Sequence, residues 1–440
     1  MKLQRKPYRG TRDFLPAGSR IINYLFDQMH SAAQIFGYQH YRGPLLEELD
    51  LYKAKSGEEL VNEQLYSFTD RGKREVAIRP EMTPTLARMV ASNHKDLPKP
   101  IRWYSIPNLM RYEKPQRGRL REHWQFNCDI FVQPDEAQIL GAEFEILSLV
   151  SHLMKSFGAT SEQFEIRVND RRIVDSLLSE TLKLDEETRY KVYKLIDRSE
   201  KISQEKFEKD LNEIISDESH KSILKEYLTI NELSELETFS KNHLTEASTT
   251  SFLKLLTTIQ GSAIEPFIIF KPSIVRGLDY YTGLVFEVFD KHPENKRAIC
   301  GGGSYDKLLT IFGEDPLPAT GFGLGDVTLK DFLETHGLLP DLEKDLFTLF
   351  ASTQVEDPSG NIQTLISKLR EENFSIVESF APIKMRKAFQ MADKNRCEFL
   401  LIAGDQELEA NEVAIKDLKK KEQKQFKIDD IEGISKFLRG

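Results

Sequence analysis

The sequence predicts an α/β protein of the α+β type, in which a mainly antiparallel sheet domain with a helical insertion precedes a small α/β domain. Three observations support this prediction. Short β-type runs recur in residues 1–160 without regular strand–helix alternation, helical spacing dominates residues 161–264, and strands alternate with helices after residue 345. We therefore predict one domain over residues 1–340, with its insertion at about 161–264, and a second over residues 345–440.

The first predicted element is a helix from Ser19 to Phe36. Ser19 is a residue type that caps helices, apolar residues recur on one face, and Gly37 favours the end of the helix. An extended segment interrupted by Pro44 follows, and then come the β-type runs QLYSF, VAIRP, IRWYSI and WQFNCDIFV. Their spacing favours a mixed or antiparallel sheet over a doubly wound fold.

The region from residue 161 to residue 264 differs in composition from the rest. It is rich in Lys, Glu, Ser and Leu, as in DRSEKISQEKFEKDLNEIISD, which predicts a group of helices. β-type residues return at FIIFKPSIV, so we interpret the helices as an insertion within the sheet domain. After the linker HGLLPDLEKD, the runs LFTLFAS, FSIVES and EFLLIAG alternate with helical stretches, which predicts a small independent α/β domain.

The composition is that of a globular protein, with 40% hydrophobic and 30% charged residues. No apolar run approaches the ~20 residues that a membrane span requires, so we predict no membrane association. Cys128, Cys300 and Cys397 lack metal-ligand spacing, which suggests reduced thiols in the cytoplasm and no protein-bound metal. The net charge is −9, but residues 1–125 hold 22 Lys+Arg against 14 Asp+Glu, which allows a local basic face.

Two clusters in the first domain carry candidate binding residues. In RPEMTPTLARM, Arg79, Glu81 and Thr83 follow the β-type run VAI, and a helix begins near Pro84. A plain helix start explains this pattern equally well. In LMRYEKPQRGRLREHWQFNCD, five cations surround one Pro-Gln-Arg-Gly turn, with two glutamates opposed. Such a run is usually a solvated face, but its self-repulsion favours a polyphosphate or nucleic acid partner.

Two further clusters follow the helical insertion. VRGLDYYTG places an arginine, an aspartate and two tyrosines between two β-type segments, where a hairpin would need only a short turn. ICGGGSYDKL is glycine-rich and is equally compatible with a simple turn. GFGLG matches part of a dinucleotide-binding fingerprint, but no βαβ unit follows it, so we discount that interpretation.

Together these segments resemble those of a known family. GTRDFLP, RPEMT, RYEKPQRGRLREHWQF, VRGLDYYTG and GGGSYDKL are similar, in this order, to the signature segments of histidyl-tRNA synthetases, which are class II aminoacyl-tRNA synthetases. The C-terminal GDQELEANEVAIKDL is similar to the anticodon-binding domain of that family. The resemblance covers nearly the whole chain and is weakest in the helical insertion. It implies a class II catalytic domain followed by an anticodon-binding domain.

The resemblance also implies a reaction. An ATP-dependent histidine–tRNA ligase activates L-histidine as histidyl-adenylate, releases pyrophosphate and transfers the histidine to the 3′ end of tRNA(His). The expected partners are L-histidine, ATP with Mg²⁺ on its outer phosphates, and tRNA(His). Pro44 matches the dimer-interface segment of the class, which implies a cytoplasmic homodimer.

Individual residues gain expected roles from the resemblance. Arg111 in MRYE and Arg276 in VRGLDYY match the two arginines at the ATP α-phosphate, which makes them the catalytic candidates. Glu81 and Tyr281 would contact the two imidazole nitrogens of the substrate. The residues expected to bind L-histidine are Glu81, Thr83, Gln125, Asp129, Tyr280 and Tyr281. The residues expected to bind ATP are Arg111, Glu113, Arg119 and Arg121.

Several positions depart from the family pattern. Thr328 stands where the third class II signature has the arginine that holds the ATP γ-phosphate, so Arg119 or another nearby arginine would have to replace it. Asp129 stands where the family often has glutamate, which keeps the charge but shortens the reach. Asn127 replaces a usual glycine, and Ser304 replaces an arginine.

Two other functions stay open on the sequence. A non-catalytic paralogue resembling the regulatory subunit of ATP phosphoribosyltransferase would bind histidine without charging tRNA. Such paralogues lack the C-terminal domain, whereas this chain keeps VRGLDYY, Arg111 and the tail. A synthetase for proline, threonine or glycine would share the tail but lack the two tyrosines after RGLD.

Overall fold

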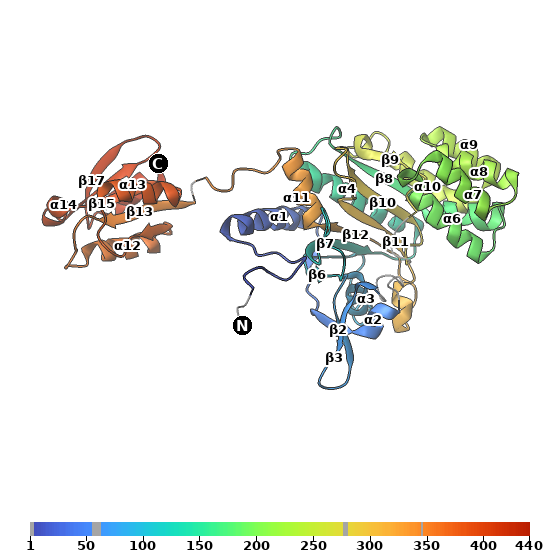
Figure 1. Cartoon of the computed structure of the whole chain (residues 1–440), viewed down its shortest axis with the longest axis horizontal. Coiled ribbons are helices and arrows are strands. Elements are labelled where there is room, and N and C mark those ends of the chain that lie inside the picture. Colours follow the sequence, from blue (N-terminus) through green and yellow to red (C-terminus); the bar gives the residue numbers. More distant parts are fainter. Residues whose placement is uncertain (1–3, 55–62, 276–279, 345) are drawn as a thin grey trace. The chain divides into compact units, whose positions relative to one another are not determined.

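The computed structural model describes residues 4–54, 63–275, 280–344 and 346–440 (Figure 1). The chain divides into two compact units, Met1–Leu339 and Pro340–Gly440. The first is built on a large, mainly antiparallel sheet, and the second is a small α/β unit. The predicted fold class is therefore confirmed.

A large sheet forms the body of the first unit. Among the described residues its strand order is β1-β5-β7-β12-β11-β10-β8-β9, with β6 paired to β7. Neighbouring strands are antiparallel except for the pairs β1–β5 and β8–β9. The strands are β1 (Gln39–His40), β5 (Ile101–Ser105), β6 (Asn108–Met110), β7 (Glu122–Phe131), β8 (Phe164–Asp170), β9 (Ile268–Phe270), β10 (Leu284–Asp290), β11 (Cys300–Tyr305) and β12 (Ala319–Gly325).

A small sheet and a set of helices complete the first unit. The small sheet, ordered β2-β4-β3, contains β2 (Leu46–Glu48), β4 (Glu75–Ile78) and β3 (Tyr66–Thr69). The helices are α1 (Pro16–Ile35), α2 (Leu49–Lys53), α3 (Thr83–Ala91), α4 (Glu136–Ser156), α5 (Arg171–Ser176), α6 (Glu186–Arg198), α7 (Gln204–Ile214), α8 (Glu218–Thr229), α9 (Leu233–His243), α10 (Glu246–Ile259) and α11 (Asp326–Thr335). A π-helical turn, Leu177–Thr181, extends α5, and 3₁₀ turns lie at Ser199–Lys201, Glu265–Phe267 and Leu308–Phe312.

Helix α1 begins three residues before the predicted start. Pro16 occupies its first turn, where the missing backbone N–H has no intrahelical partner to lose. Ser19 already lies inside the helix, and its N–H donates to the carbonyl oxygen of Leu15. The predicted end is confirmed, because the helix stops at Ile35 and Gly37 has a φ of +78°.

The helical insertion is narrower than the predicted range 161–264. Strand β8 lies inside that range, and all its residues pair with β10 in the large sheet. Its buried Phe164, Ile166 and Val168 alternate with more exposed residues, which is the period of a strand. The surrounding Lys- and Glu-rich sequence obscures this short alternation. Helices α6 to α10 gather at one end of the unit (Figure 1).

Strand β7 shows how the two faces of the large sheet differ. Phe126, Cys128 and Ile130 belong to the main hydrophobic core, to which α1 and α4 contribute. Because successive side chains of a strand point to opposite faces, the residues between them lie on the other face. The polar side chains on that other face are Gln125, Asn127 and Asp129.

The second unit contains one five-stranded sheet, ordered β14-β13-β15-β16-β17. Strand β13 is parallel to both β14 and β15, whereas β16 is antiparallel to its neighbours. Separate apolar clusters contain alternating β15 residues, Phe399 and Leu401 in one, Leu400 and Ile402 in the other. The elements are β13 (Phe347–Thr353), α12 (Asn361–Glu371), β14 (Ile376–Glu378), α13 (Met385–Lys394), β15 (Cys397–Ala403), α14 (Asp405–Glu409), β16 (Glu412–Asp417), β17 (Gln423–Lys427) and α15 (Ile431–Arg439).

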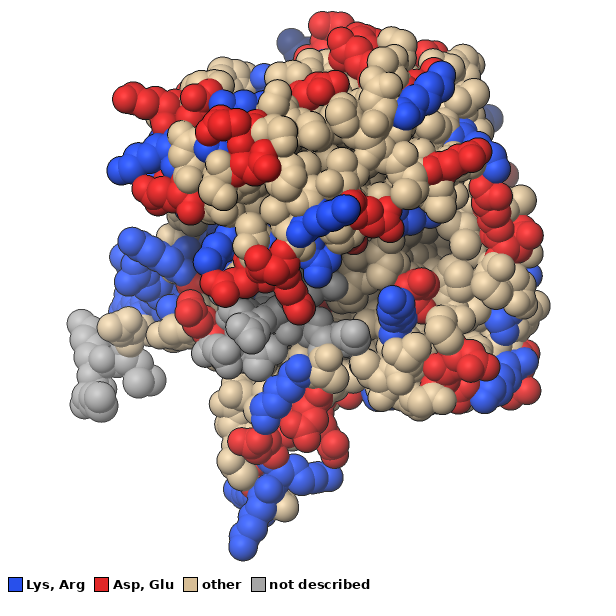
Figure 2. Space-filling model, turned by 90° about the vertical axis from the view of Figure 1, so that its right-hand side faces the viewer, with Lys and Arg blue, Asp and Glu red and all other residues tan. Residues whose placement is uncertain are grey.

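The surface of the first unit carries both signs of charge. Figure 2 shows acidic and basic side chains intermixed over the face that includes the helical insertion. Within the described part of the chain, no helix has the length and apolarity needed to cross a membrane. Cys128, Cys300 and Cys397 are buried and form no disulfide.

Candidate active site

The candidate site lies on the polar face of the large sheet, and glycines keep the floor of the site open. Gly321 pairs with Asp129, and a Cβ atom at position 321 would overlap the Asp129 carboxylate. A Cβ atom at Gly323 would lie 2.7 Å from Cδ of Gln125. Any larger residue at these positions would displace the polar side chains of β7. The glycine-rich strands therefore create the space in which those side chains stand.

Asp129 is a buried carboxylate with one hydroxyl partner. Its side chain is 3% exposed, and the Tyr305 hydroxyl donates to Oδ1 at 2.7 Å. Burial raises the pKa of Asp129 to about 7, while the hydrogen bond from Tyr305 opposes this rise. The carboxyl group is therefore close to half-protonated at neutral pH, and a bound cation would drive it to the charged form.

Aromatic rings and a second carboxylate lie near Asp129. The ring centroids of Tyr280 and Tyr281 are 5.0 Å apart, and Tyr280 lies 5.5 Å from Tyr305. Burial raises the pKa of Tyr280, as do Tyr281 and the buried Glu81 carboxylate, whereas a hydrogen bond with Thr83 lowers it. These side chains are thus close neighbours of one another. The structure therefore brings Glu81, Thr83, Asp129, Tyr280 and Tyr281 of the predicted histidine set together.

A cavity of 720 Å³ is lined in part by Gln125, which lies on the same face of β7 as Asp129. It collects three of the predicted ATP-binding residues and adds cations that the sequence did not single out. Its polar and charged lining includes Arg111, Glu113, Arg119, His123, Gln125, Lys201, Glu287, Lys296, Arg297 and Thr328. Glu81, Thr83, Asp129, Tyr280 and Tyr281 do not line the cavity itself.

Hydrogen bonds and an ion pair hold Arg111, Glu113 and Arg119 in the cavity wall. Nε of Arg111 donates to the carbonyl oxygen of Pro80 at 2.8 Å, which ties the loop after β6 to the loop before α3. The Arg119 guanidinium bonds both carboxylate oxygens of the buried Glu113, with Nη2 at 2.6 Å from Oε1. Glu113 therefore neutralises Arg119, whereas Arg111 keeps its charge for a ligand.

Arg121 is the one predicted ATP-binding residue that does not line this cavity. Its Nη1 donates to the Tyr8 hydroxyl at 2.7 Å, and its Nε donates to the Glu113 carbonyl oxygen. Its guanidinium also lies 4.2 Å from the centre of the Tyr112 ring. Arg121 therefore stabilises the loop between β6 and β7 without facing the cavity. Arg276, the second catalytic candidate, lies outside the described residues.

Two residues near the cavity were missed from the sequence. Asp326 begins α11 with a fully buried side chain, which accepts from Nη2 of Arg12 and from the backbone N–H of Trp124, both at 2.8 Å. Asp326 thus anchors the segment GTRDFLP, which contains Arg12, to β7. That segment was the sequence signal that could have pointed to a buried partner for Arg12. Burial, followed by Arg111 and Arg12, lowers the pKa of His123 to about 3, so this imidazole is neutral beside the cations.

Comparisons with known proteins agree with this geometry. Residues 10–328 match the family described as histidyl-tRNA synthetase, and residues 352–436 match the anticodon binding domain. The histidine–tRNA ligase of Leptospira biflexa is 41% identical over 428 residues, which cover 97% of this chain and 96% of that protein.

Solved structures share the fold at lower sequence identity. A histidyl-tRNA synthetase from Nostoc sp. PCC 7120 aligns with a TM-score of 0.79 at 22% identity, over 99% of this chain and 100% of that one. An ATP phosphoribosyltransferase regulatory subunit/histidyl-tRNA synthetase from Bacillus halodurans aligns with a TM-score of 0.75 at 22% identity, over 92% and 99%. These two likenesses show the fold alone. The family match over residues 10–328 and the 41% identical relative go further: the chain belongs to the histidyl-tRNA synthetase family.

Proposed function

We propose that this protein is an ATP-dependent histidine–tRNA ligase, which forms histidyl-adenylate and transfers histidine to the 3′ end of tRNA(His). One observation carries the proposal. Two buried carboxylates, Glu81 and Asp129, lie near Tyr280 and Tyr281, and Gln125, on the same face of β7 as Asp129, lines the cavity that contains the arginines. A substrate held in a pocket among these side chains would therefore present its carboxylate to a nucleotide in the cavity.

The pocket suits an α-amino acid with an imidazole side chain. Asp129 would accept from the α-ammonium group together with Gln125 and Thr83. Glu81 and Tyr281 would contact the ring nitrogens, with Tyr280 shaping the wall. A side chain that lacked these nitrogens would leave buried polar groups without partners, which gives strong discrimination. No editing site is then required.

The cavity suits the triphosphate of ATP. Arg111 would bind the α-phosphate, and Arg276 would share this role, as the family resemblance implies. The histidine carboxylate attacks the α-phosphorus in line and pyrophosphate leaves, so positioning and charge neutralisation supply most of the rate enhancement. Glu113 and Arg119 would form the edge of the nucleotide site, and Arg121 would hold their loop.

Magnesium would enter with the nucleotide. Among the described residues, no group of three or more His, Cys, Asp or Glu side chains could hold a metal ion. The arginine-rich wall fits phosphates rather than a bare cation, so Mg²⁺ would neutralise the outer phosphates. The protein would supply position and the remaining positive charge.

The two units would divide the binding of tRNA. The catalytic unit, predicted as residues 1–340, would receive the acceptor end, and the C-terminal unit, predicted as 345–440, would bind the anticodon. We further propose a cytoplasmic homodimer formed through the segment around Pro44. On the face shown in Figure 2 acidic and basic side chains are intermixed, so that face offers tRNA no broad basic surface.

Pyrophosphate exchange tests the proposed reaction. The purified protein should exchange labelled pyrophosphate into ATP only when L-histidine is added, and it should then charge tRNA(His). Histidine binding without any exchange would instead identify a histidine sensor. Exchange with proline, threonine or glycine would identify another synthetase of the class.

A further inference from the structure

Thr328 occupies the position of a phosphate-binding arginine, but its side chain has a different task. Its hydroxyl lies 3.2 Å from the carbonyl oxygen of Ile299 and 3.3 Å from that of Gly325. The hydroxyl therefore holds the start of α11 to the connection between β10 and β11. Its methyl group faces Gly118, where a Cβ atom would lie 3.4 Å from Cγ2 of Thr328. No positive charge is offered from this position.

Arg297 reaches the same place from the β10–β11 connection. A Cβ atom at Gly118 would lie 2.9 Å from Cδ of Arg297, so the arginine side chain runs beside Thr328. Arg297 lines the 720 Å³ cavity together with Arg111 and Arg119. The position on α11 at which the resemblance leads us to expect an arginine thus carries no charge, and Arg297 reaches the same wall from a neighbouring loop.

Two other arginines of this loop, Arg117 and Arg119, are already paired with carboxylates. Arg119 is held by the buried Glu113 through both carboxylate oxygens. Arg117 donates to Oδ1 of Asn295 at 2.9 Å and bonds Glu294. For Arg297 no hydrogen bond or ion pair to any described residue is present. Its charge is available to an anion.

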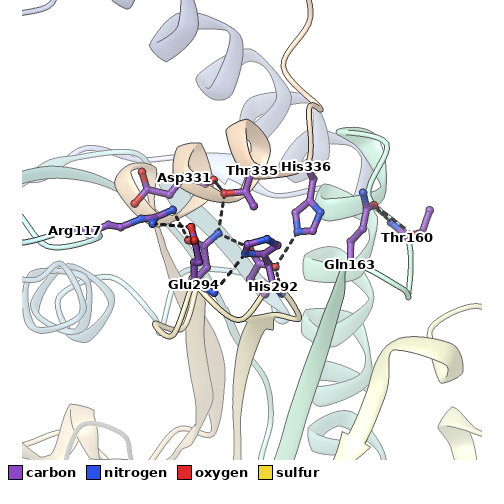
Figure 3. A network of polar contacts seen from close by, with 10 residues as sticks. Arg117, Thr160, Gln163, His292, Glu294, Asp331, Thr335 and His336 are labelled. Atoms are coloured by element: carbon purple, nitrogen blue, oxygen red, sulfur yellow. Dashed lines mark hydrogen bonds and ion pairs between the residues drawn. The ribbon is translucent and has the colours of Figure 1, made fainter.

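A polar network fixes the connection that carries Arg297 (Figure 3). At its base, the buried carboxylate of Asp290 bonds the His292 backbone N–H at 2.7 Å, Nδ2 of Asn295 at 2.6 Å and Nε2 of His336 at 2.8 Å. Asn295 also donates to the Thr335 hydroxyl at 3.0 Å. The connection is thus fastened to α11 on one side and, through Arg117, to the cavity loop on the other.

The electrostatic environment agrees with an unneutralised cation. Burial, and then repulsion from Arg119, lower the pKa of Arg297, and attraction to Glu113 only partly offsets them. Bringing polyphosphate oxygens between the two guanidinium groups would remove this repulsion. The planar fork of arginine suits such oxygens.

We propose that Arg297 holds the γ-phosphate of ATP in place of the arginine that the third class II signature usually supplies. The inference rests on the proposed ATP-dependent function and assigns a phosphate contact that the signature segments do not contain. Arg119, the replacement considered from the sequence, would keep its bond with Glu113 and shape the nucleotide edge.

Nucleotide titrations of the full-length protein test this assignment. The wild-type protein should bind MgATP more tightly than MgADP, because ADP lacks the contacted phosphate. In Arg297→Ala, MgATP should bind roughly 10- to 100-fold more weakly, the size expected for a lost charged hydrogen bond. MgADP binding should change less than about twofold, and Arg297→Lys should keep part of the preference for ATP. Isothermal titration calorimetry measures both constants.

Lys291→Ala is the matched control. Lys291 is a cation of the same connection, but its Nζ donates to the Ser161 carbonyl oxygen at 2.8 Å and it does not line the cavity. Its removal should leave both nucleotide affinities unchanged. Thermal unfolding of each variant verifies that it is folded.

The outcomes separate this inference from the proposed function. An Arg297→Ala protein with the wild-type ratio of ATP to ADP affinity, or with both affinities lowered equally, would overturn the assignment of Arg297. If the wild-type protein shows no histidine-dependent exchange but Arg297→Ala loses the preference for ATP, the proposed function is wrong and the phosphate contact stands. If the wild-type protein shows normal exchange but Arg297→Ala keeps the preference for ATP, the proposed function stands and the phosphate contact is wrong.

Discussion

The two ends of the site are built differently. The floor of the predicted histidine site stands on strands, with Gln125 and the buried Asp129 on β7 and glycines on β12 facing them. The arginines that line the nucleotide cavity, Arg111, Arg119 and Arg297, lie in loops, and their side chains are more exposed to solvent. The role of a side chain on a strand can be taken over only by a residue at the same position, because the direction of the side chain is fixed by the strand. The role of a loop residue can be taken over by a residue of a neighbouring loop that reaches the same point.

Two positions at which the sequence departs from the expected family pattern illustrate this difference. Thr328, on α11, stands where the resemblance leads us to expect an arginine, and we propose that Arg297 of the neighbouring loop takes its place. On the strand side, Ser304 stands where an arginine is expected, and its hydroxyl donates to the buried Glu143 at 2.7 Å. Burial, reinforced by Asp170, raises the pKa of Glu143 to about 7. The buried Glu143 thus has no arginine from position 304 beside it, whereas we propose that Arg297 takes the place of an arginine at position 328.

The largest effect should follow from filling the glycine floor. Gly321→Ala would place a Cβ atom against the Asp129 carboxylate and 2.8 Å from the Cys128 carbonyl oxygen. Because a strand cannot shift alone, we expect kcat/KM for histidine in pyrophosphate exchange to fall at least about 100-fold. Overpacking should also lower the free energy of unfolding by roughly 1–3 kcal/mol. Exchange kinetics and chemical denaturation measure the two effects.

Gly141→Ala controls for the substitution itself. Gly141 lies within α4, and a Cβ atom there would have nothing within 4 Å. The variant should keep full exchange activity and gain up to about 1 kcal/mol of stability. Normal histidine kinetics in Gly321→Ala would show that the sheet adjusts, and the distinction between strand and loop would fail.

The strand-built end was also the more predictable from sequence. The alternation in WQFNCDIF places Gln125 and Asp129 on one face, and the family segments identified the tyrosines. Tyr8 contacts Arg121, and Arg297 lies beside Thr328, although these residues are far apart in the chain. Sequence periodicity does not predict such long-range contacts. Strand β8 was missed for a related reason, because its pairing with β10 crosses the whole insertion.

The next effect concerns the pH at which histidine binds. Asp129 has a pKa of about 7 when no ligand is bound, and it must be ionised to accept from an ammonium group. As the pH falls below 7 the protonated fraction grows, so kcat/KM for histidine should fall about tenfold per pH unit. Tyr305→Phe removes the hydrogen bond that lowers this pKa, so the decline should begin at a higher pH.

Asp129→Asn separates this titration from that of the substrate. The imidazole of free histidine ionises in both reactions, so the ratio of wild-type to variant kcat/KM isolates the contribution of Asp129. The ratio should rise from about pH 6 to a plateau near pH 8. A ratio independent of pH would mean that the carboxylate is ionised throughout this range.

A smaller effect tests the charge balance that Ser304 leaves in the sheet. The folded-state pKa of Glu143 is raised to about 7 from an ordinary 4.5, so stability falls as the pH rises through this window and the full cost is reached above it. Glu143→Gln keeps an acceptor for the Ser304 hydroxyl and removes the buried charge. It should stabilise the protein by roughly 2 kcal/mol at pH 8 and by much less at pH 5. Denaturant unfolding at both pH values measures this; equal changes would contradict it.

The smallest effect concerns the loop-built end. Asn295→Ala removes the bonds of one side chain to Asp290, Thr335 and Arg117 without touching the cavity cations. If the network only steadies the connection that carries Arg297, KM for ATP should rise about two- to fivefold, equivalent to one modest hydrogen bond, with KM for histidine unchanged. Asn231→Ala, which removes a bond to the Thr229 carbonyl oxygen in the insertion, should alter neither constant. An equal rise in both constants for Asn295→Ala would mean that the histidine site also depends on this connection, because one substitution can weaken both binding sites only if both depend on the same segment.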